Sequence, residues 1–311
     1  MVMLRNPYGH GMVFKCQGTS AIVKCSFPDA HSPVFSRLLG APGRTKGIPM
    51  TSVIDPNASP NAAGHEELQQ AGFTVLKRVI APAAIADTRR TILTNSLLLR
   101  NTRPAPSAGH LAGFHRFAEL EPLHSLLSCN QRILSVLREA TKGSVCTIGL
   151  SDITVNRSQG WHRDLLRGSY RSYVDADLIW SDAHGVLFKA LLYLQDSSSL
   201  RLIAGSHRCR CSLDSDFDSE PTAGDTILTP SVQAGDVVLM DLRMSHCGSD
   251  DNFFTSAAVQ KHPKILVSTV FGAVNSPVTQ QMELGNAIRQ ADWMKRNWPR
   301  ETCQLAEAAM A

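Results

Sequence analysis

The sequence predicts a mainly β domain flanked by α-helices, with its strands arranged as an antiparallel sandwich or barrel. Three observations indicate this class. Short β-type runs follow one another from residue 144 to about residue 275, turn residues such as Gly, Pro, Asp and Ser separate them, and helical stretches stand before and after them. With 311 residues, 43% of them hydrophobic and 19% charged, the chain is long enough to bury a sizeable core.

Residues 1–63 are rich in Gly, Pro, Ser and Asn and show little periodicity, so we expect a loop-rich N-terminal extension. The ordered domain is expected over residues 64–311, beginning with a helical support over residues 64–143. In this support "HEELQQ" starts a helix and "GFTVLKRVI" has the pattern of a strand. The stretch "APAAIADTRRTILTNSLLL" predicts a helix that opens just after Pro82.

One amphipathic helix is expected over residues 121–141, because six apolar side chains can share one face. They are Leu123, Leu126, Leu127, Ile133, Leu134 and Leu137. The β-core is expected over residues 144–275, in the runs "SVCTIGLSDITVN", "VLFKALLYLQ", "LRLIAG", "DTILTP", "DVVLMDLRM" and "KILVSTVFGAV". A C-terminal helix over residues 278–297 closes the domain.

Composition excludes several classes of function. No apolar run approaches the roughly 18 residues of a membrane span, and the start "MVMLRNPYGHGMVFK" lacks the regions of a secretory signal. The formal charge of +4 is spread along the chain, without a basic run interleaved with aromatics, so neither a membrane nor nucleic acid is expected as a partner. Eight cysteines without a CxxC pair indicate reduced thiols and a cytoplasmic protein.

Two separated segments carry candidate metal ligands. In "SQGWHRDLLRG" His162 and Asp164 stand two positions apart, so on a strand both side chains would point to the same side. Far downstream, "AGDVVLMDLRMSHCGSDDN" contains a turn at Gly235-Asp236 and an apolar strand that ends near His246. Because both segments belong to one predicted sheet system, the three side chains can converge.

Two imidazoles and one carboxylate on one face of a metal leave three coordination positions open, which suits non-haem Fe(II). Taken separately, the same residues have plainer interpretations. A His-x-Asp triplet occurs by chance, and His246 could simply be hydrogen-bonded at a strand end.

Further motifs accompany these residues in a fixed order. "GFTVLKRVI" precedes a helix, Gln159 stands three residues before His162, a "YLQD" strand follows, and then come the loop "LIAGSH" and "GDVVLMD…H…N". Over residues 66–275 this ordered set resembles the phytanoyl-CoA dioxygenase-like family of Fe(II)/2-oxoglutarate-dependent oxygenases. The resemblance implies a double-stranded β-helix (jelly-roll, cupin-like) core. It also implies His162, Asp164 and His246 as iron ligands, with 2-oxoglutarate and O₂ as cosubstrates and no further catalytic residue.

The sequence departs from the family at the basic residue that binds the far carboxylate of 2-oxoglutarate. Relatives use an arginine there, which matches a carboxylate with two donors, but "NFFTSAAVQKHPKILVSTVFG" contains none. Lys264 is the first substitute and Lys189, within the apolar run "VLFKALLYL", the second. Either lysine could instead be a solvated residue on a strand. Gln159 could contact the cosubstrate or the substrate, or belong to a turn.

The long insertion over residues 165–185 follows the first two ligands directly, and such loops commonly form lids or substrate walls. Candidate substrate-binding residues are Trp161, Tyr170, Arg171, Tyr173, Trp180 and Arg243. The residues of the insertion could equally pack the loop onto the domain, and Arg243 could face outward.

The resemblance implies oxidation of an unactivated C–H bond in a small metabolite or natural-product intermediate, with release of succinate and CO₂. Hydroxylation is favoured because Asp164 is present where halogenating relatives carry a small residue. Desaturation, cyclisation and rearrangement use the same ligands. The missing arginine leaves open a non-oxidative metal-dependent cupin-like enzyme, and a jelly-roll small-molecule-binding protein without turnover is the remaining alternative.

Overall fold

A computed structural model describes residues 60–101, 108–157, 159–181, 186–210, 219–248 and 262–297. The predicted extension over residues 1–63 therefore lies outside the described residues, except for its last four. Residues 249–261, which precede Lys264, and residues 182–185 of the insertion also lie outside them.

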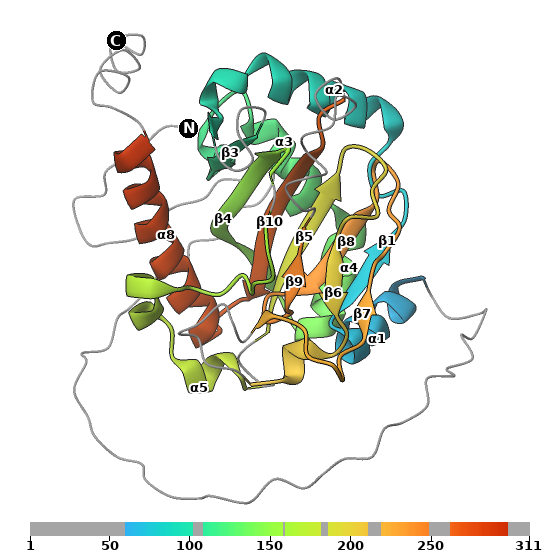
Figure 1. Ribbon diagram of the computed structural model, residues 1–311, viewed down its shortest axis with the longest axis vertical. Coiled ribbons are helices and arrows are strands. Elements are labelled where there is room, and N and C mark those ends of the chain that lie inside the picture. The colour runs from blue at the N-terminus through green and yellow to red at the C-terminus, as the bar shows by residue number, and fades with distance from the viewer. Residues whose placement is uncertain are drawn as a thin grey trace, which may run out of the picture. The chain divides into compact units, whose positions relative to one another are not determined.

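The larger of two antiparallel sheets has seven strands in the order β1-β8-β5-β10-β4-β3-β2 (Figure 1). Their bounds are β1 Phe73–Leu76, β2 Arg100–Asn101, β3 Gly109–Ala112, β4 Val145–Val155, β5 Leu187–Tyr193, β8 Val237–Asp241 and β10 Ile265–Ala273. The smaller sheet has the order β7-β6-β9, from Ile227–Leu228, Arg201–Ile203 and His246–Cys247.

The alternation of side chains along β5 shows how this sheet separates a helical layer from an interior pocket. Phe188, Ala190 and Leu192 belong to the large apolar cluster that includes residues of the flanking helices. Lys189 and Tyr193 project to the opposite face, where they line the pocket. Because residues two apart on a strand share a face, a single charged residue is accommodated in an otherwise apolar strand.

The described helices are α1 Pro60–Ala71, α2 Pro82–Thr94, α3 Glu121–Ser128, α4 Gln131–Thr141, the short α5 Ala176–Ile179 and α8 Pro277–Asn297. The predicted single helix over residues 121–141 is wrong, since it is two helices. Asn130 begins the second, because its side-chain oxygen accepts hydrogen bonds from the amides of Arg132 and Ile133, at 3.1 and 3.3 Å. All six apolar residues predicted for the shared face still belong to the core or pack against it.

The predicted strand ending near His246 is also interrupted. β8 ends at Asp241, whose carboxylate accepts a hydrogen bond from the Arg243 amide at 2.8 Å, and the Met244 amide donates to the Asp241 carbonyl at 3.0 Å. This turn takes the chain out of the larger sheet, so that His246 opens β9 in the smaller sheet.

Antiparallel sheets with flanking helices confirm the predicted fold class. In Figure 1, α8 stands beside β4, and its contacts with β4 and with the 3₁₀ helix Gly168–Tyr173 place it along one side of the pocket. No helix among the described residues combines the length and apolar character needed to cross a membrane.

Candidate metal centre

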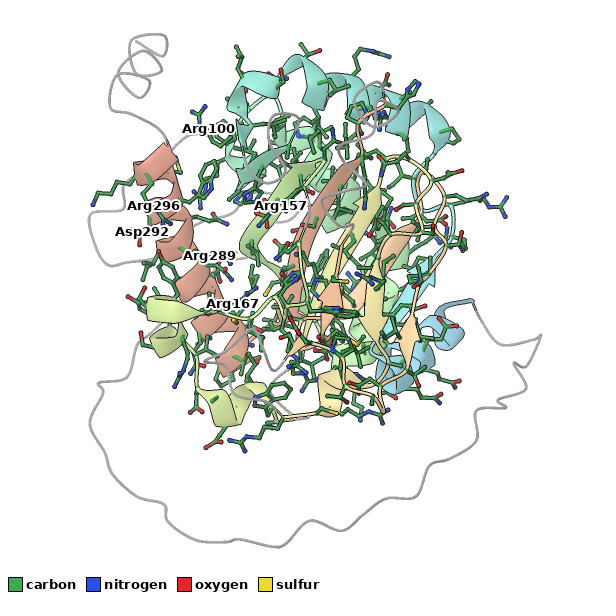
Figure 2. The ribbon with its side chains drawn as sticks, viewed as in Figure 1. Arg100, Arg157, Arg167, Arg289, Asp292 and Arg296 are labelled. Atoms are coloured by element: carbon green, nitrogen blue, oxygen red, sulfur yellow. The ribbon has the colours of Figure 1, made fainter. Side chains whose placement is uncertain are left out.

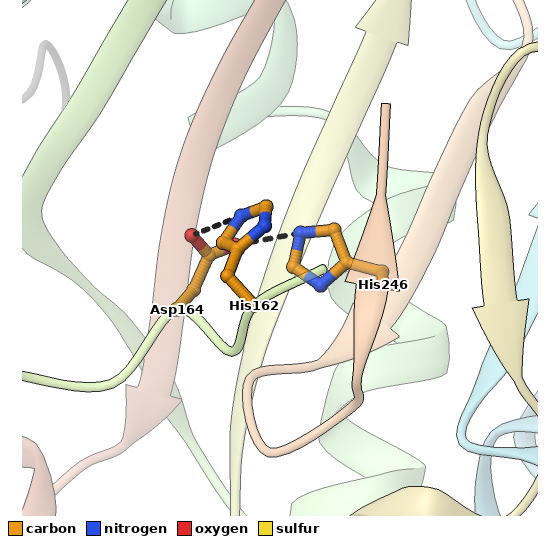
Figure 3. Close-up of side chains that lie close together, drawn as sticks. All are labelled: His162, Asp164 and His246. Atoms are coloured by element: carbon orange, nitrogen blue, oxygen red, sulfur yellow. Dashed lines mark ion pairs between the residues drawn. The ribbon is translucent and has the colours of Figure 1, made fainter. Parts of the chain in front are cut away.

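His162 and His246 are joined through their main chains. The His162 amide donates to the His246 carbonyl at 2.9 Å and the His246 amide donates to the His162 carbonyl at 3.0 Å, which forms an isolated antiparallel bridge. This pairing brings the two imidazole ring centroids to 4.2 Å. Figure 3 shows both rings beside Asp164.

Each buried imidazole is oriented by a carbonyl group. His162 Nδ1 lies 2.7 Å from the Gly160 carbonyl oxygen, and His246 Nδ1 lies 3.1 Å from the Met244 carbonyl oxygen. A carbonyl only accepts hydrogen bonds, so Nδ1 carries the proton in both rings. In the neutral ring this tautomer leaves the lone pair on Nε2, which is the form of histidine that binds metals.

Asp164 completes the cluster. Its Oδ1 lies 3.7 Å from His162 Nε2 and its Oδ2 lies 3.4 Å from His246 Nε2. One ligand atom from each residue lies within 4.8 Å of the others. The strand periodicity that motivated the pairing of His162 with Asp164 is wrong, because the segment after His162 is a bend and not a strand. The bend nevertheless turns the carboxylate toward both imidazoles.

The charge states of the cluster suit metal binding. Burial alone would raise the pKa of Asp164, but the Lys189 ammonium, His246 and His162 outweigh it and hold this pKa well below its usual value. Burial, followed by repulsion from His162, lowers the pKa of His246 to about 3 against the opposing effect of Asp164. A neutral imidazole and an ionised carboxylate are therefore available near neutral pH.

These residues fit a divalent transition metal. Two neutral imidazoles and one carboxylate form the donor set of a non-haem Fe(II) site, and three protein ligands leave positions open for other molecules. Within the described residues, this is the group of histidine, cysteine and acidic side chains that could hold a metal ion.

The cluster lines a pocket of about 420 Å³ whose walls come from the larger sheet, β9 and α8. Lys264, Leu266 and Ser268 line it from one face of β10 and the residue before the strand. Asn156 fixes the main chain of Lys264, because its side-chain oxygen accepts from the Lys264 amide at 2.7 Å and its own amide donates to the Lys264 carbonyl at 2.8 Å. The predicted substitute for the family arginine therefore faces the pocket.

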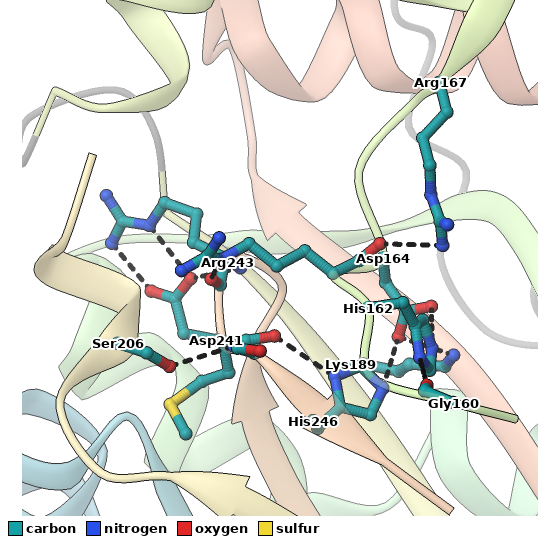
Figure 4. Close-up of polar contacts among 12 residues, drawn as sticks. Gly160, His162, Asp164, Arg167, Lys189, Ser206, Asp241, Arg243 and His246 are labelled. Carbon is teal, nitrogen blue, oxygen red and sulfur yellow. Dashed lines mark hydrogen bonds and ion pairs between the residues drawn. The ribbon is translucent and has the colours of Figure 1, made fainter. Parts of the chain in front are cut away.

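The Lys264 ammonium group bonds to the Ser199 hydroxyl and lies 5.8 Å from the centre of the Tyr193 ring. Burial lowers the pKa of Lys264 to about 8. Lys189 is placed differently, since its Nζ donates to Asp164 Oδ2 at 2.8 Å, as Figure 4 shows. Lys189 thus contacts the candidate ligand Asp164. Lys264 lines the pocket and bonds to Ser199 instead.

Several solved structures have a similar architecture. EctD from S. alaskensis in its apoform is 18% identical, with a TM-score of 0.52, over 73% of this chain and 80% of that chain. The non-heme α-ketoglutarate-dependent epimerase SnoN from nogalamycin biosynthesis is 14% identical, with a TM-score of 0.50, over 68% and 80%. The non-heme α-ketoglutarate-dependent carbocyclase SnoK is 16% identical, with a TM-score of 0.50, over 70% and 85%.

The chain has the jelly-roll fold of these enzymes. SnoN has also been solved in complex with Fe³⁺, α-ketoglutarate and nogalamycin RO. No protein-family model matches the chain, and no curated protein does.

The other predicted site residues fall into two groups, those that line the pocket and those that do not. Gln159 and Tyr170 line the pocket, and the Tyr170 hydroxyl donates to Asp292 of α8 at 2.7 Å. Five candidates are not among the lining residues, namely Trp161, Arg171, Tyr173, Trp180 and Arg243. Tyr173 and Trp180 instead pack against the apolar cluster beneath the insertion.

Arg243 and Trp161 have other partners in the structure. Arg243 is buried and forms a two-point ion pair with Asp241, at 2.9 Å from Nε and 2.7 Å from Nη2 (Figure 4). Trp161 lies beneath the Arg201 guanidinium, 5.5 Å from its carbon to the ring centre.

Sequence reasoning missed several residues that line the jelly-roll pocket. Asp152 of β4 is one, and with its neighbour His110 of β3 it forms a 3.6 Å pair. A charged residue in the apolar run "LSDITV" was the available signal for Asp152. Four arginines are also among the missed lining residues, namely Arg157, Arg167, Arg289 and Arg296.

Proposed function

We propose that this protein is an Fe(II)/2-oxoglutarate-dependent oxygenase of the phytanoyl-CoA dioxygenase-like branch. It oxidises a C–H bond of a small molecule, by default through hydroxylation, with release of succinate and CO₂. The observation that carries the proposal is the His162, Asp164 and His246 cluster, in which both Nε2 atoms turn toward one carboxylate inside a jelly-roll. A cytoplasmic location remains part of the proposal and rests on the sequence.

The three clustered side chains would hold the iron, which when bound supplies the oxidising chemistry with 2-oxoglutarate and O₂. The residues of this chain provide orientation. The Gly160 and Met244 carbonyls keep the Nε2 atoms directed at the metal position, and Lys189 keeps Asp164 ionised.

Lys264 is the residue that we assign to the far carboxylate of 2-oxoglutarate. Its position on the pocket wall, its fixed main chain and its ammonium group at the Ser199 hydroxyl support this role. A lysine offers a point charge rather than a two-pronged fork, and Ser199 would supply the second hydrogen bond. Lys189 supports the carboxylate ligand in this proposal and does not bind the cosubstrate.

An anaerobic titration tests the proposal without knowledge of the substrate. Fe(II) and then 2-oxoglutarate are added, and the weak visible charge-transfer band that family members show on chelation is recorded. We expect the band in the wild-type protein and its loss in His246→Ala. Zn(II) in place of Fe(II) is the matched control and should give no band.

Iron binding without a band would contradict the proposal and favour the non-oxidative metal-dependent enzyme. Absence of iron binding would favour the binding protein without turnover. SnoN is described as an epimerase and SnoK as a carbocyclase, so the reaction outcome is read separately, from incorporation of ¹⁸O₂ into the product once a substrate is in hand.

A further inference from the structure

Four arginines from three segments of the chain line the pocket. Arg157 follows β4, Arg167 lies three residues after the ligand Asp164, and Arg289 and Arg296 belong to α8. On a helix, residues seven apart return to the same face, so Arg289 and Arg296 both line the pocket. Figure 2 shows the four labels grouped along β4 and α8.

The charges that line the pocket do not balance. The described lining residues include six cations and two carboxylates, because Lys189 and Lys264 join the four arginines while Asp152 and Asp164 oppose them. A divalent metal and a doubly charged 2-oxoglutarate would cancel each other, so the surplus of four positive charges would remain. Asp292 lies close by, but it is not a lining residue and accepts a hydrogen bond from Tyr170.

The arginines are held close together at some electrostatic cost. Burial lowers the pKa of Arg157, Asp152 and Asp164 oppose that effect, and Arg289 and Arg167 lower the pKa further by repulsion. No hydrogen bond or ion pair joins the side chain of Arg157 or Arg289 to another of the described residues. Like charges gathered at a half-buried wall indicate a site whose balancing anion comes from a ligand.

We propose that the substrate carries a phosphate-type dianion, which Arg157, Arg167 and the two α8 arginines bind at the mouth of the pocket. A planar carboxylate is saturated by one or two guanidinium forks. Phosphate has three acceptor oxygens and up to two charges, so it accepts donors that approach from several elements. This inference rests on the proposed function, since it names the substrate class of the same pocket.

The arginines of α8 and the candidate metal ligands come from different parts of the fold. The arginines on α8 come from an element that contributes no metal ligand, whereas Arg167 continues the segment that carries His162 and Asp164. Binding of a phosphate group across these two elements would fasten the substrate at one end and leave its remaining part directed into the pocket toward the metal position.

Calorimetric titration of the full-length protein, loaded with Zn(II) and 2-oxoglutarate, tests this inference. The probes are phenyl phosphate, phthalate as an aromatic dianion with carboxylates, and phenol as a neutral comparison. We expect phenyl phosphate to bind more tightly than phthalate and phenol not to bind. Arg157→Met and Arg289→Met should each weaken phenyl phosphate binding by about tenfold or more.

Arg90→Met is the matched control, because Arg90 is exposed on α2, pairs with Asp87 and does not line the pocket. It should leave binding unchanged. Arg296→Met removes an exposed side chain with little risk to folding and should also weaken binding. Equal binding in all variants, tighter binding of phthalate, or no binding of phenyl phosphate would overturn the inference.

The charge-transfer band separates this outcome from failure of the proposed function. An intact band in the wild type without arginine-dependent binding of phenyl phosphate would overturn the phosphate inference alone. Arginine-dependent binding without a band would overturn the oxygenase proposal alone.

Discussion

The Lys189 ammonium nitrogen lies 2.8 Å from Asp164 Oδ2, and the same oxygen lies 3.4 Å from His246 Nε2. The partly buried Lys189 ammonium and the His246 imidazole thus approach the same oxygen of Asp164. A nearby positive charge favours the ionised form of a carboxyl group, so Lys189 keeps Asp164 ready to bind a metal.

Lys189→Met should make metal binding more sensitive to acid. Without the ammonium group the pKa of Asp164 rises, and protons then compete with the metal at higher pH than in the wild-type protein. Zn(II) affinity measured between pH 5 and about pH 8 should therefore fall earlier as the pH is lowered. Lys295→Met, at an exposed position of α8, should follow the wild-type curve.

Loss of any ligand should abolish iron retention. His162→Ala, Asp164→Ala and His246→Ala each remove one of three donors, and metal analysis after anaerobic loading and gel filtration should find little iron in each. His262→Ala is the control, since His262 is exposed and does not line the pocket. Normal iron content and turnover in His162→Ala or Asp164→Ala would refute the ligand assignment.

Lys264→Ala should weaken the binding of 2-oxoglutarate while leaving iron bound. A hydrogen bond to a charged group contributes about 1.5–3 kcal/mol, so the Kd for 2-oxoglutarate should rise roughly tenfold to a hundredfold. Anaerobic titration of the charge-transfer band measures this Kd. If Lys189→Ala raises the Kd with iron still bound and Lys264→Ala does not, the carboxylate belongs to the β5 lysine.

Binding of 2-oxoglutarate should also weaken in alkaline solution. Burial lowers the pKa of Lys264 to about 8, and only the protonated amine attracts a carboxylate. The affinity should therefore be highest below pH 8 and fall as the pH rises through this value. Lys264→Arg should flatten the profile, because a guanidinium stays charged throughout this range. A wild-type profile that is flat to pH 10 would argue against Lys264.

Arg243→Met should lower stability more than substrate affinity. The Arg243 and Asp241 side chains are only 5% and 3% exposed, so removal of one partner leaves a buried charge and should cost about 3–5 kcal/mol in the free energy of unfolding. Urea denaturation measures the loss. The double variant Asp241→Asn with Arg243→Met should recover part of it, and a stable Arg243→Met protein with weakened substrate binding would restore the predicted role of Arg243 in the pocket.

The sequence was informative where a pattern has one physical interpretation. Alternating apolar runs predict strands, and the strand run around Lys189 appears as β5 with one charged residue on the pocket face. The helix break at Asn130 was missed because apolar spacing continues across it, although an asparagine that caps a helix was visible in the sequence. The capping residue Asn130, and not the spacing of apolar residues, determines where the second helix begins.

The sequence predicted which residues form the candidate metal cluster, but not which residues line the pocket around it. An ordered set of motifs predicted His162, Asp164 and His246 as ligands, and these side chains do lie together. The strand assumed around His162 is instead a bend. Arg157, Arg289 and Arg296 meet only because α8 folds back along β4. No local pattern predicts which helix covers which strand, so the basic wall became visible only in three dimensions.

The backbone bridge between His162 and His246 has a consequence for how the protein acquires its metal. Peptide groups make both hydrogen bonds, so the backbone that carries the two imidazoles can be positioned by folding, without a metal ion. We therefore expect the apo protein to fold and then to take up its metal. Which ion occupies the site would then depend on the donor set and its geometry, and on the ions that the surroundings supply.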